Sequence, residues 1–88
     1  MSGMRILLKV LPKDPEKGFE RTVEELKELQ TKLGFKFVDH RIEEIAFGIK
    51  NLYILLFTEE NVDMNELEAE ISKLDNVGNV EVVGMTRA

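Results

Sequence analysis

Apolar and polar positions follow two different periods along the chain, and these periods divide it into helices and strands. Apolar residues recur at steps of three and four from Phe19 to Leu33 and again from Met64 to Leu74, which predicts two helices. Shorter apolar runs predict four strands, at residues 5–11, 35–42, 49–57 and 80–85. The order strand, helix, strand, strand, helix, strand predicts an α+β fold, the ferredoxin-like β-α-β-β-α-β sandwich.

The strand patterns also predict places in the sheet. Segment 49–57 is apolar at successive positions, which is typical of a strand covered on both faces. Segment 35–42 alternates less cleanly, with Phe35 and Phe37 on one face and Val38 and Ile42 on the other, and we expect it near a sheet edge. Right-handed crossovers place both helices on one face of a four-stranded antiparallel sheet and leave the other face open.

Capping signals suggest where the first helix begins and ends. Asp14 before Pro15 is one candidate start, and Thr22 in the pattern Thr22-x-x-Glu25 is the other. Gly34 suits the left-handed residue that ends a helix.

The second helix and the last strand show comparable signals. The pattern Asp63-x-x-Glu66 is a capping box that predicts the start of the second helix. In the last strand, simple alternation puts Val80 and Val82 on one face and Glu81, Val83 and Met85 on the other.

Length and composition limit the classes of protein. With 88 residues we expect one domain spanning residues 1–88. The absence of cysteine excludes disulfides and cysteine zinc sites, and it agrees with a cytoplasmic location. The longest apolar run, Leu52–Phe57, is far shorter than the roughly 20 residues of a transmembrane helix, so no membrane association is expected.

The charge is acidic and uneven. Twelve basic and 17 acidic residues give a net charge of −5, which argues against direct nucleic-acid binding. Residues 1–50 carry 10 basic and 9 acidic groups, a net of +1, whereas residues 51–88 carry 2 and 8, a net of −6. We interpret the acidic stretch around the second helix as a solvated face.

No residues form a credible catalytic or metal-binding constellation. His40 is the single histidine, and the neighbours Glu43 and Glu44 point apart on a strand, so they make no acid/base pair. A phosphate cradle after the first strand is opposed by Pro12 and Pro15, which lack N–H donors. The sequence therefore predicts a protein that is not an enzyme and that holds no metal or cofactor.

Two other uses of this fold stay open as alternatives. A small-molecule-binding regulatory domain of ACT type needs a glycine-rich ligand loop after the first strand, where this chain has the segment from Pro12 to Pro15. An RNA-binding module needs stacking aromatics on the inner strands, and the first strand offers none.

The segment Ile45–Ile49 is unusual because it is apolar at a turn, where Asn, Gly and Asp are favoured. Either Phe47 folds back onto the sheet as a core residue, or it is an exposed aromatic that enters a partner's pocket.

The segment Glu43–Leu52 (EEIAFGIKNL) resembles the most specific motif of the translation elongation factor 1-beta family, in its short archaeal form. The resemblance covers nearly everything from Met4, including the opening strand and the closing segment Asn79–Arg87. It implies a guanine-nucleotide exchange factor that promotes GDP release and GTP loading on elongation factor 1-alpha. It also implies a cytoplasmic monomer without covalent chemistry.

The resemblance further implies roles for individual residues. Phe47 matches the loop aromatic that enters a hydrophobic pocket on the GTPase nucleotide-binding domain. Arg87 stands where eukaryotic members have a lysine that reaches toward the magnesium and phosphate region, and Glu44 replaces the usual proline of the loop. The remaining residues expected to bind the partner are Ile45, Ala46, Gly48, Ile49, Lys50 and Met85.

Overall fold

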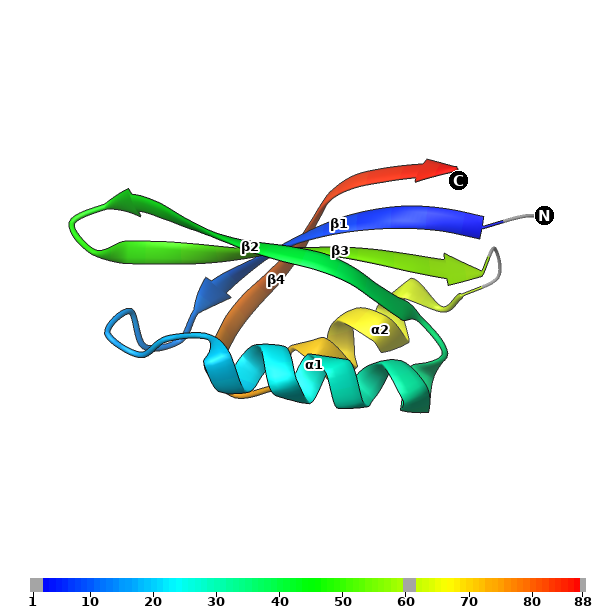
Figure 1. Cartoon of the computed structure of the whole chain (residues 1–88), viewed down its shortest axis with the longest axis horizontal. Helices are drawn as coiled ribbons and strands as arrows, with labels where there is room; N and C mark the ends of the chain where they lie inside the picture. The colour runs from blue at the N-terminus through cyan, green and yellow to red at the C-terminus, as the bar shows by residue number, and fades with distance from the viewer. Residues whose placement is uncertain (1–2, 60–61, 88) are drawn as a thin grey trace.

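Six elements follow one another in the expected order in a computed structural model, which describes residues 3–59 and 62–87 (Figure 1). The strands lie in the order β2-β3-β1-β4, every neighbouring pair is antiparallel, and both helices cover one face of the sheet. The ferredoxin-like prediction is therefore confirmed, with β2 at an edge and β3 inside. The elements are β1 (Gly3–Pro12), α1 (Glu20–Leu33), β2 (Lys36–Ala46), β3 (Ile49–Glu59), α2 (Met64–Ile71) and β4 (Val77–Arg87).

The core lies between the helices and the two inner strands. Alternate residues of β1 and β3 point toward the helices and are fully buried, and each buried aliphatic side chain stabilises the fold by about 1.5–3 kcal/mol. The β1–β3 register runs without a break from the pair Gly3 and Glu59 to the pair Val10 and Leu52. The fully buried side chains of these strands and helices include Ile6, Leu8, Val10, Leu26, Leu52, Ile54, Leu56 and Ile71.

The first helix starts later than the Asp14 signal predicts and earlier than the Thr22 signal predicts, so neither residue caps it. Helix α1 begins at Glu20, and the preceding Phe19 provides no side-chain cap but is buried in the core. The Thr22 hydroxyl instead donates to the Asp75 carbonyl at 2.6 Å. The Glu25 carboxylate accepts from the Asp75 N–H at 2.7 Å, so this pair ties α1 to the turn before β4.

The other capping predictions are confirmed. Gly34 ends α1 in the left-handed conformation with φ of 77°. The Asp63 carboxylate accepts hydrogen bonds from the backbone N–H groups of Asn65 and Glu66, at 3.0 and 3.2 Å. Local capping chemistry thus satisfies exposed backbone groups where α1 ends and where α2 begins.

The acids of helix α2 lie outside its buried residues Leu67 and Ile71, with Glu66 exposed and Glu68 and Glu70 partly exposed. Glu70 lies 3.3 Å from the Lys73 ammonium and 3.6 Å from that of Lys32, on α1. The hydrogen bond and charge of Lys73, followed by the charge of Lys32, lower the pKa of the Glu70 carboxyl. These pairs link the helix surfaces at positions open to water.

Strand β2 contains two irregularities in its pairing with β3, next to Val38 and next to Ile45. Because of the first, Phe37 lies opposite Leu56 and Ile42 lies opposite Leu52, so both are on the helix-covered face. The prediction that Phe37 and Ile42 occupy opposite faces is wrong, because one extra residue reverses the alternation.

Strand β4 has a comparable irregularity next to Val83 in its pairing with β1. Val82 lies opposite Leu8 and Met85 lies opposite Ile6, which places both on the helix-covered face. The prediction that Val82 and Met85 lie on opposite faces is therefore also wrong, for the same physical reason.

Candidate functional site

The hairpin of β2 and β3 forms a projecting arm at one end of the sheet (Figure 1). Every residue from 38 to 50 is exposed, because the helices do not cover this part of the sheet. Ala46 and Ile49 face each other across a two-residue turn made of Phe47 and Gly48. The arm thus presents the apolar motif of the sequence at its tip.

Phe47 is held in an unusual backbone conformation. Its φ is 51° and that of Gly48 is 80°, the two positive values that define the type I′ hairpin turn. Positive φ suits Gly48 but costs a residue with a bulky side chain on the order of 1–3 kcal/mol. The Phe47 side chain is fully exposed, at 102% of its reference area. Of the two alternatives for Phe47, the core residue is therefore wrong and the exposure of the ring is confirmed, whereas its entry into a partner's pocket stays a prediction.

Further apolar side chains surround the tip. Ile45 and Ile49 are 56% and 45% exposed, and Ile42 is exposed to a similar extent farther along the arm. Ala46, Gly48 and Lys50 are also exposed. The structure therefore brings together around Phe47 all but two of the residues expected to contact a partner.

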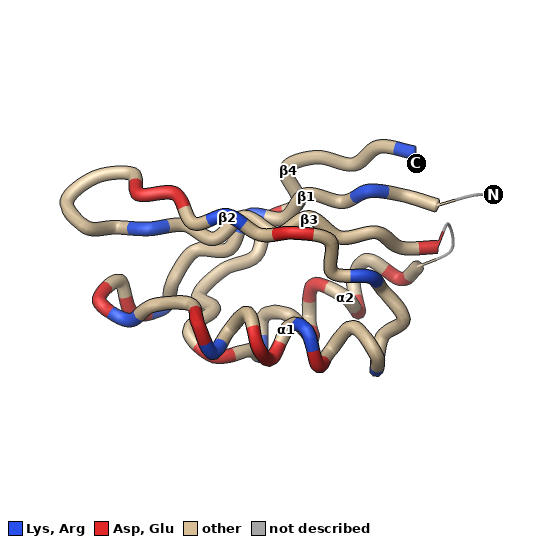
Figure 2. Tube along the Cα trace, viewed as in Figure 1, with Lys and Arg blue, Asp and Glu red and all other residues tan. Residues whose placement is uncertain are grey.

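Charges of both signs lie behind this apolar tip. Figure 2 shows an acidic segment on one strand of the arm and a basic position on the other. Glu44 lies opposite Lys50 in the register, and the Arg41 guanidinium lies 3.6 Å from the Glu43 carboxylate. The tip thus combines an apolar end with a polar rim, the usual composition of a protein-binding surface.

Arg87 lies at the opposite end of the sheet from Phe47. It pairs with Met4, which pairs in turn with Thr58 near the end of β3, whereas Phe47 precedes the first residue of that strand. The nine steps from Ile49 to Thr58 span about 30 Å at strand geometry. The molecule measures 43 Å along its longest axis, and the hairpin and the end of β4 lie at opposite ends of it (Figure 1). The structure does not bring Phe47 and Arg87 together.

Met85 lies near Arg87 and not near the hairpin. It is two residues away on the same strand, on the same face of the sheet, and is about half exposed. The residues singled out from the sequence therefore form two separate groups, a tip around Phe47 and an end of β4 with Met85 and Arg87.

The residues considered for catalysis stay apart. His40 is exposed on β2, with its ring 5.7 Å from that of Phe37. Glu43 and Glu44 are exposed neighbours on the same strand. Within residues 3–59 and 62–87, no group of three or more His, Cys, Asp and Glu side chains is placed to hold a metal ion.

The loop where an ACT-type ligand would sit is filled by the protein's own Asn76. This buried residue donates from its Nδ2 to the carbonyls of Lys17 and Gly18, and its Oδ1 accepts from the Asp14 N–H at 2.8 Å. The β1–α1 loop is therefore tied to the turn before β4, with its backbone groups already used.

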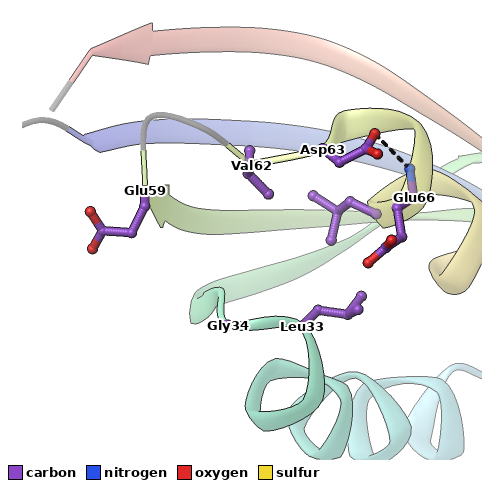
Figure 3. A pocket seen from close by; sticks show the side chains of 7 residues that line it. Leu33, Gly34, Glu59, Val62, Asp63 and Glu66 are labelled. Atoms are coloured by element: carbon purple, nitrogen blue, oxygen red, sulfur yellow. Dashed lines mark hydrogen bonds between the residues drawn. The ribbon is translucent and has the colours of Figure 1, made fainter.

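A hollow of 310 Å³ lies where the end of α1, the end of β3 and the start of α2 meet (Figure 3). Three of its seven lining residues are acidic, and Asp63 among them is occupied in capping α2. Figure 3 shows the Glu59 side chain directed away from the other two carboxylates. The described residues of its lining include no basic side chain, so this hollow does not suit an anionic ligand.

Sequence reasoning missed two features of these groups. The irregularity next to Val83 determines the face on which Met85 and Arg87 lie, and its one signal in the sequence is the adjacent Gly84, because a glycine inside a strand often marks a bulge. The left-handed turn at Phe47 has a partial signal, because Gly48 follows the aromatic and glycine is favoured in such turns.

Comparisons with known proteins agree with the geometry. Residues 5–88 match the family described as the EF-1 guanine nucleotide exchange domain. Elongation factor 1-beta of Metallosphaera sedula is 35% identical over 91 residues, which cover 99% of this chain and 97% of the relative. The Sulfurisphaera tokodaii protein of that name is 34% identical over 90 residues, with the same two coverages. That of Methanococcus vannielii is 35% identical over 80 residues, covering 90% of each chain.

The described part of the chain contains no helix that is long and apolar enough to cross a membrane. The family match covers nearly the whole sequence, and the similarity to elongation factor 1-beta extends from end to end. The chain therefore belongs to the EF-1 guanine nucleotide exchange domain family, and it is a nucleotide exchange factor for the GTPase elongation factor 1-alpha and not an enzyme.

Proposed function

We propose that this protein speeds GDP release from elongation factor 1-alpha through two separate contacts, one made by Phe47 and one by Arg87. The observation that supports this most directly is the fully exposed Phe47 in a left-handed turn. Strain of this kind persists where the surrounding structure imposes it, and it concentrates at functional sites. The exposed Phe47 ring does not stabilise the core of its own chain. Insertion into a partner's pocket, the role that the family resemblance implies, explains why an aromatic occupies a position with an unfavourable backbone conformation.

Phe47 acts as an anchor in an apolar pocket of the GTPase nucleotide-binding domain. A single aromatic that is fully buried on binding contributes roughly 2–4 kcal/mol, and the rigid two-residue turn limits the ordering cost. Ile45, Ile49 and Ala46 extend the apolar contact around the aromatic ring. Gly48 permits the turn, and Lys50 belongs to the polar rim.

Arg87 acts at the other end, toward the magnesium ion and phosphates that the GTPase uses to hold GDP. Its guanidinium is always charged and planar, so it competes with the metal for phosphate oxygens. Met85 extends this second contact. A thousandfold faster release requires about 4 kcal/mol of barrier lowering, which one anchored aromatic and one competing cation together can supply.

Exchange follows from coupling between these contacts and the nucleotide. If the factor weakens GDP binding, GDP weakens binding of the factor by the same free energy, and incoming GTP then expels it. This mechanism needs a single copy of the chain, so we propose that it works as a cytoplasmic monomer.

The anchor is tested by Phe47→Ala in an assay of fluorescent GDP release from elongation factor 1-alpha. We expect most of the exchange activity to be lost while the melting temperature stays close to that of the wild type, because the ring packs against nothing in the free protein. A large fall in melting temperature, with exchange per folded molecule preserved, would contradict the proposed role.

The cation is tested by Arg87→Ala in millimolar Mg²⁺ and in EDTA. We expect release to slow by about tenfold with Mg²⁺ and far less with EDTA, since a cation that competes with the metal has nothing to displace once the metal is chelated. Equal effects in the two buffers would show that Arg87 only docks the partner.

A further inference from the structure

The face of the sheet on which Arg87 lies depends on one irregular residue of β4. From Val80 to Val82 the strand pairs regularly with Val10 and Leu8, and from Gly84 to Arg87 it pairs regularly with Leu7 to Met4. Val83 is the extra residue between these two stretches. Figure 1 shows β4 changing direction between its first half, beside the helices, and its red end. A change of direction is what a bulge produces.

The register gives the consequence for Arg87. Residues opposite each other in an antiparallel pair lie on the same face, and Met4, the partner of Arg87, packs against the core on the helix-covered side. Regular pairing through Val83 would instead set Val83 opposite Leu7 and Met85 opposite Arg5. Arg87 would then lie on the open face of the sheet.

Core packing does not explain why Val83 is extra. Its side chain is 44% exposed and lies outside the buried cluster, whereas Val82 packs against that cluster. Regular pairing would have set it against the partly exposed Leu7, which is an acceptable apolar pair. A lack of room opposite Leu7 does not explain the bulge either. Gly84 is the present partner of Leu7, and a Cβ added to it would meet the Leu7 side chain at an ordinary 3.7 Å.

We propose that Arg87 promotes exchange only from the helix-covered face of the sheet, and that the bulge at Val83 is the positioning device that puts it there. This inference rests on the role proposed above for Arg87. The number of residues between Val82 and Arg87 and the presence of a bulge then matter in combination, because together they determine the face on which Arg87 lies.

Two single-residue deletions of equal length test the proposal. Deletion of Val83 removes the bulge but leaves Gly84 opposite Leu7 and Arg87 opposite Met4, so Arg87 keeps its face. Deletion of Thr86 leaves the bulge and Met85 in place but brings Arg87 opposite Arg5, on the open face. Both variants keep every buried core residue, and their melting temperatures show whether they fold.

We expect deletion of Thr86 to slow GDP release in Mg²⁺ about as much as Arg87→Ala does, on the order of tenfold, and to have little effect in EDTA. We expect deletion of Val83 to stay within about twofold of the wild type. Adding Arg87→Ala to the Thr86 deletion should cause no further loss, because the two changes remove the same interaction. If the Thr86 deletion acted only by disturbing the fold, it would slow GDP release equally in Mg²⁺ and in EDTA.

A third variant moves the cation without changing the length. Thr86→Arg in the Arg87→Ala background places a guanidinium one residue away but on the open face, and it should fail to restore exchange. Restoration by this variant, or equal loss in the two deletions, would overturn the proposal while leaving the role of Arg87 intact. If the Arg87→Ala variant promotes exchange at the wild-type rate, the proposed role of Arg87 is wrong, and this inference is then wrong as well.

Discussion

The inner pair of strands and the two edge strands follow different rules. Strands β1 and β3 keep one register over their whole length, from Gly3 opposite Glu59 to Val10 opposite Leu52. The pairings of β2 with β3 and of β4 with β1 each shift twice. Two of these shifts, next to Ile45 and next to Val83, directly precede the groups that contain Phe47 and Arg87. The register shifts of the edge strands therefore determine the faces on which exposed residues lie, whereas the inner pair keeps a single register.

The physical reason lies in what a one-residue slip costs. In β1 or β3 a slip would turn a row of fully buried side chains toward the open face, and it would break hydrogen bonds on both sides of the strand. An edge strand has hydrogen bonds on one side only, and the exposed residues 38–45 of β2 have no core packing to lose. Extra residues are tolerated there at lower cost.

The comparison is tested most strongly in the inner pair. Ile54→Ala should lower the free energy of unfolding by about 2–5 kcal/mol, because it removes a fully buried side chain from β3 and leaves a cavity. Urea denaturation measures the loss. GDP release per folded molecule should stay at the wild-type level, and a selective loss of exchange would show that the inner frame also takes part in the contact.

A smaller effect of opposite sign is expected at the tip of the arm. Phe47→Gly should raise the free energy of unfolding by about 0.5–1 kcal/mol, because relief of the left-handed strain exceeds the extra entropy of glycine in the unfolded chain. Exchange should nevertheless fall as far as in Phe47→Ala.

Phe47→Ala is the matched control for this gain in stability. It removes the same ring but keeps the cost of positive φ, so its denaturation midpoint should match that of the wild type. Equal midpoints for the glycine and alanine variants would mean that the turn carries no strain.

The smallest effect is expected on α2, outside both parts of the sheet. Glu70→Gln removes a carboxyl whose pKa is lowered from 4.5 by Lys73 and then by Lys32, so the ion pair stabilises the fold above that value and is lost as the pH falls below it. Exposed pairs of this kind contribute little.

We therefore expect Glu70→Gln to differ from the wild type barely measurably at pH 7 in denaturation experiments, and the difference to shrink as the carboxyl becomes protonated at acidic pH. Glu68→Gln is the control that lacks the lysine partners described for Glu70. GDP release should stay at the wild-type rate for both variants. A drop at low salt that disappears with added salt would make this acidic helix a steering surface for the partner.

The sequence was informative wherever the signal was local. The helical periods, the cap at Asp63, the left-handed end at Gly34 and the apolar strand β3 were all predicted, because each depends on neighbouring residues. The start of α1 was not, because Thr22 and Glu25 bind Asp75, in a turn 53 and 50 residues farther along the chain. Contacts of that kind arise only once the chain has folded.

The candidate groups show the same division. The motif around Phe47 was identified from its residues, but its exposure depends on a turn type that only the register of the arm decides. Arg87 was also identified, but simple alternation put the end of β4 on the wrong face, because it took no account of the bulge that Gly84, next to Val83, signals only weakly. The length of the sheet between the two groups followed only from the strand order.

The bulges in the outer strands also bear on the solubility of the protein. Unpaired strand edges are templates for edge-to-edge aggregation, which natural sheets prevent with bulges and with charges. The shift next to Val38 interrupts the free edge of β2, and the stretch that follows it carries Asp39, Arg41, Glu43 and Glu44. The shift next to Val83 interrupts the free edge of β4. A protein that must expose isoleucines and a phenylalanine at its tip can therefore remain dispersed at high concentration, because neither edge offers a long regular strand to another copy.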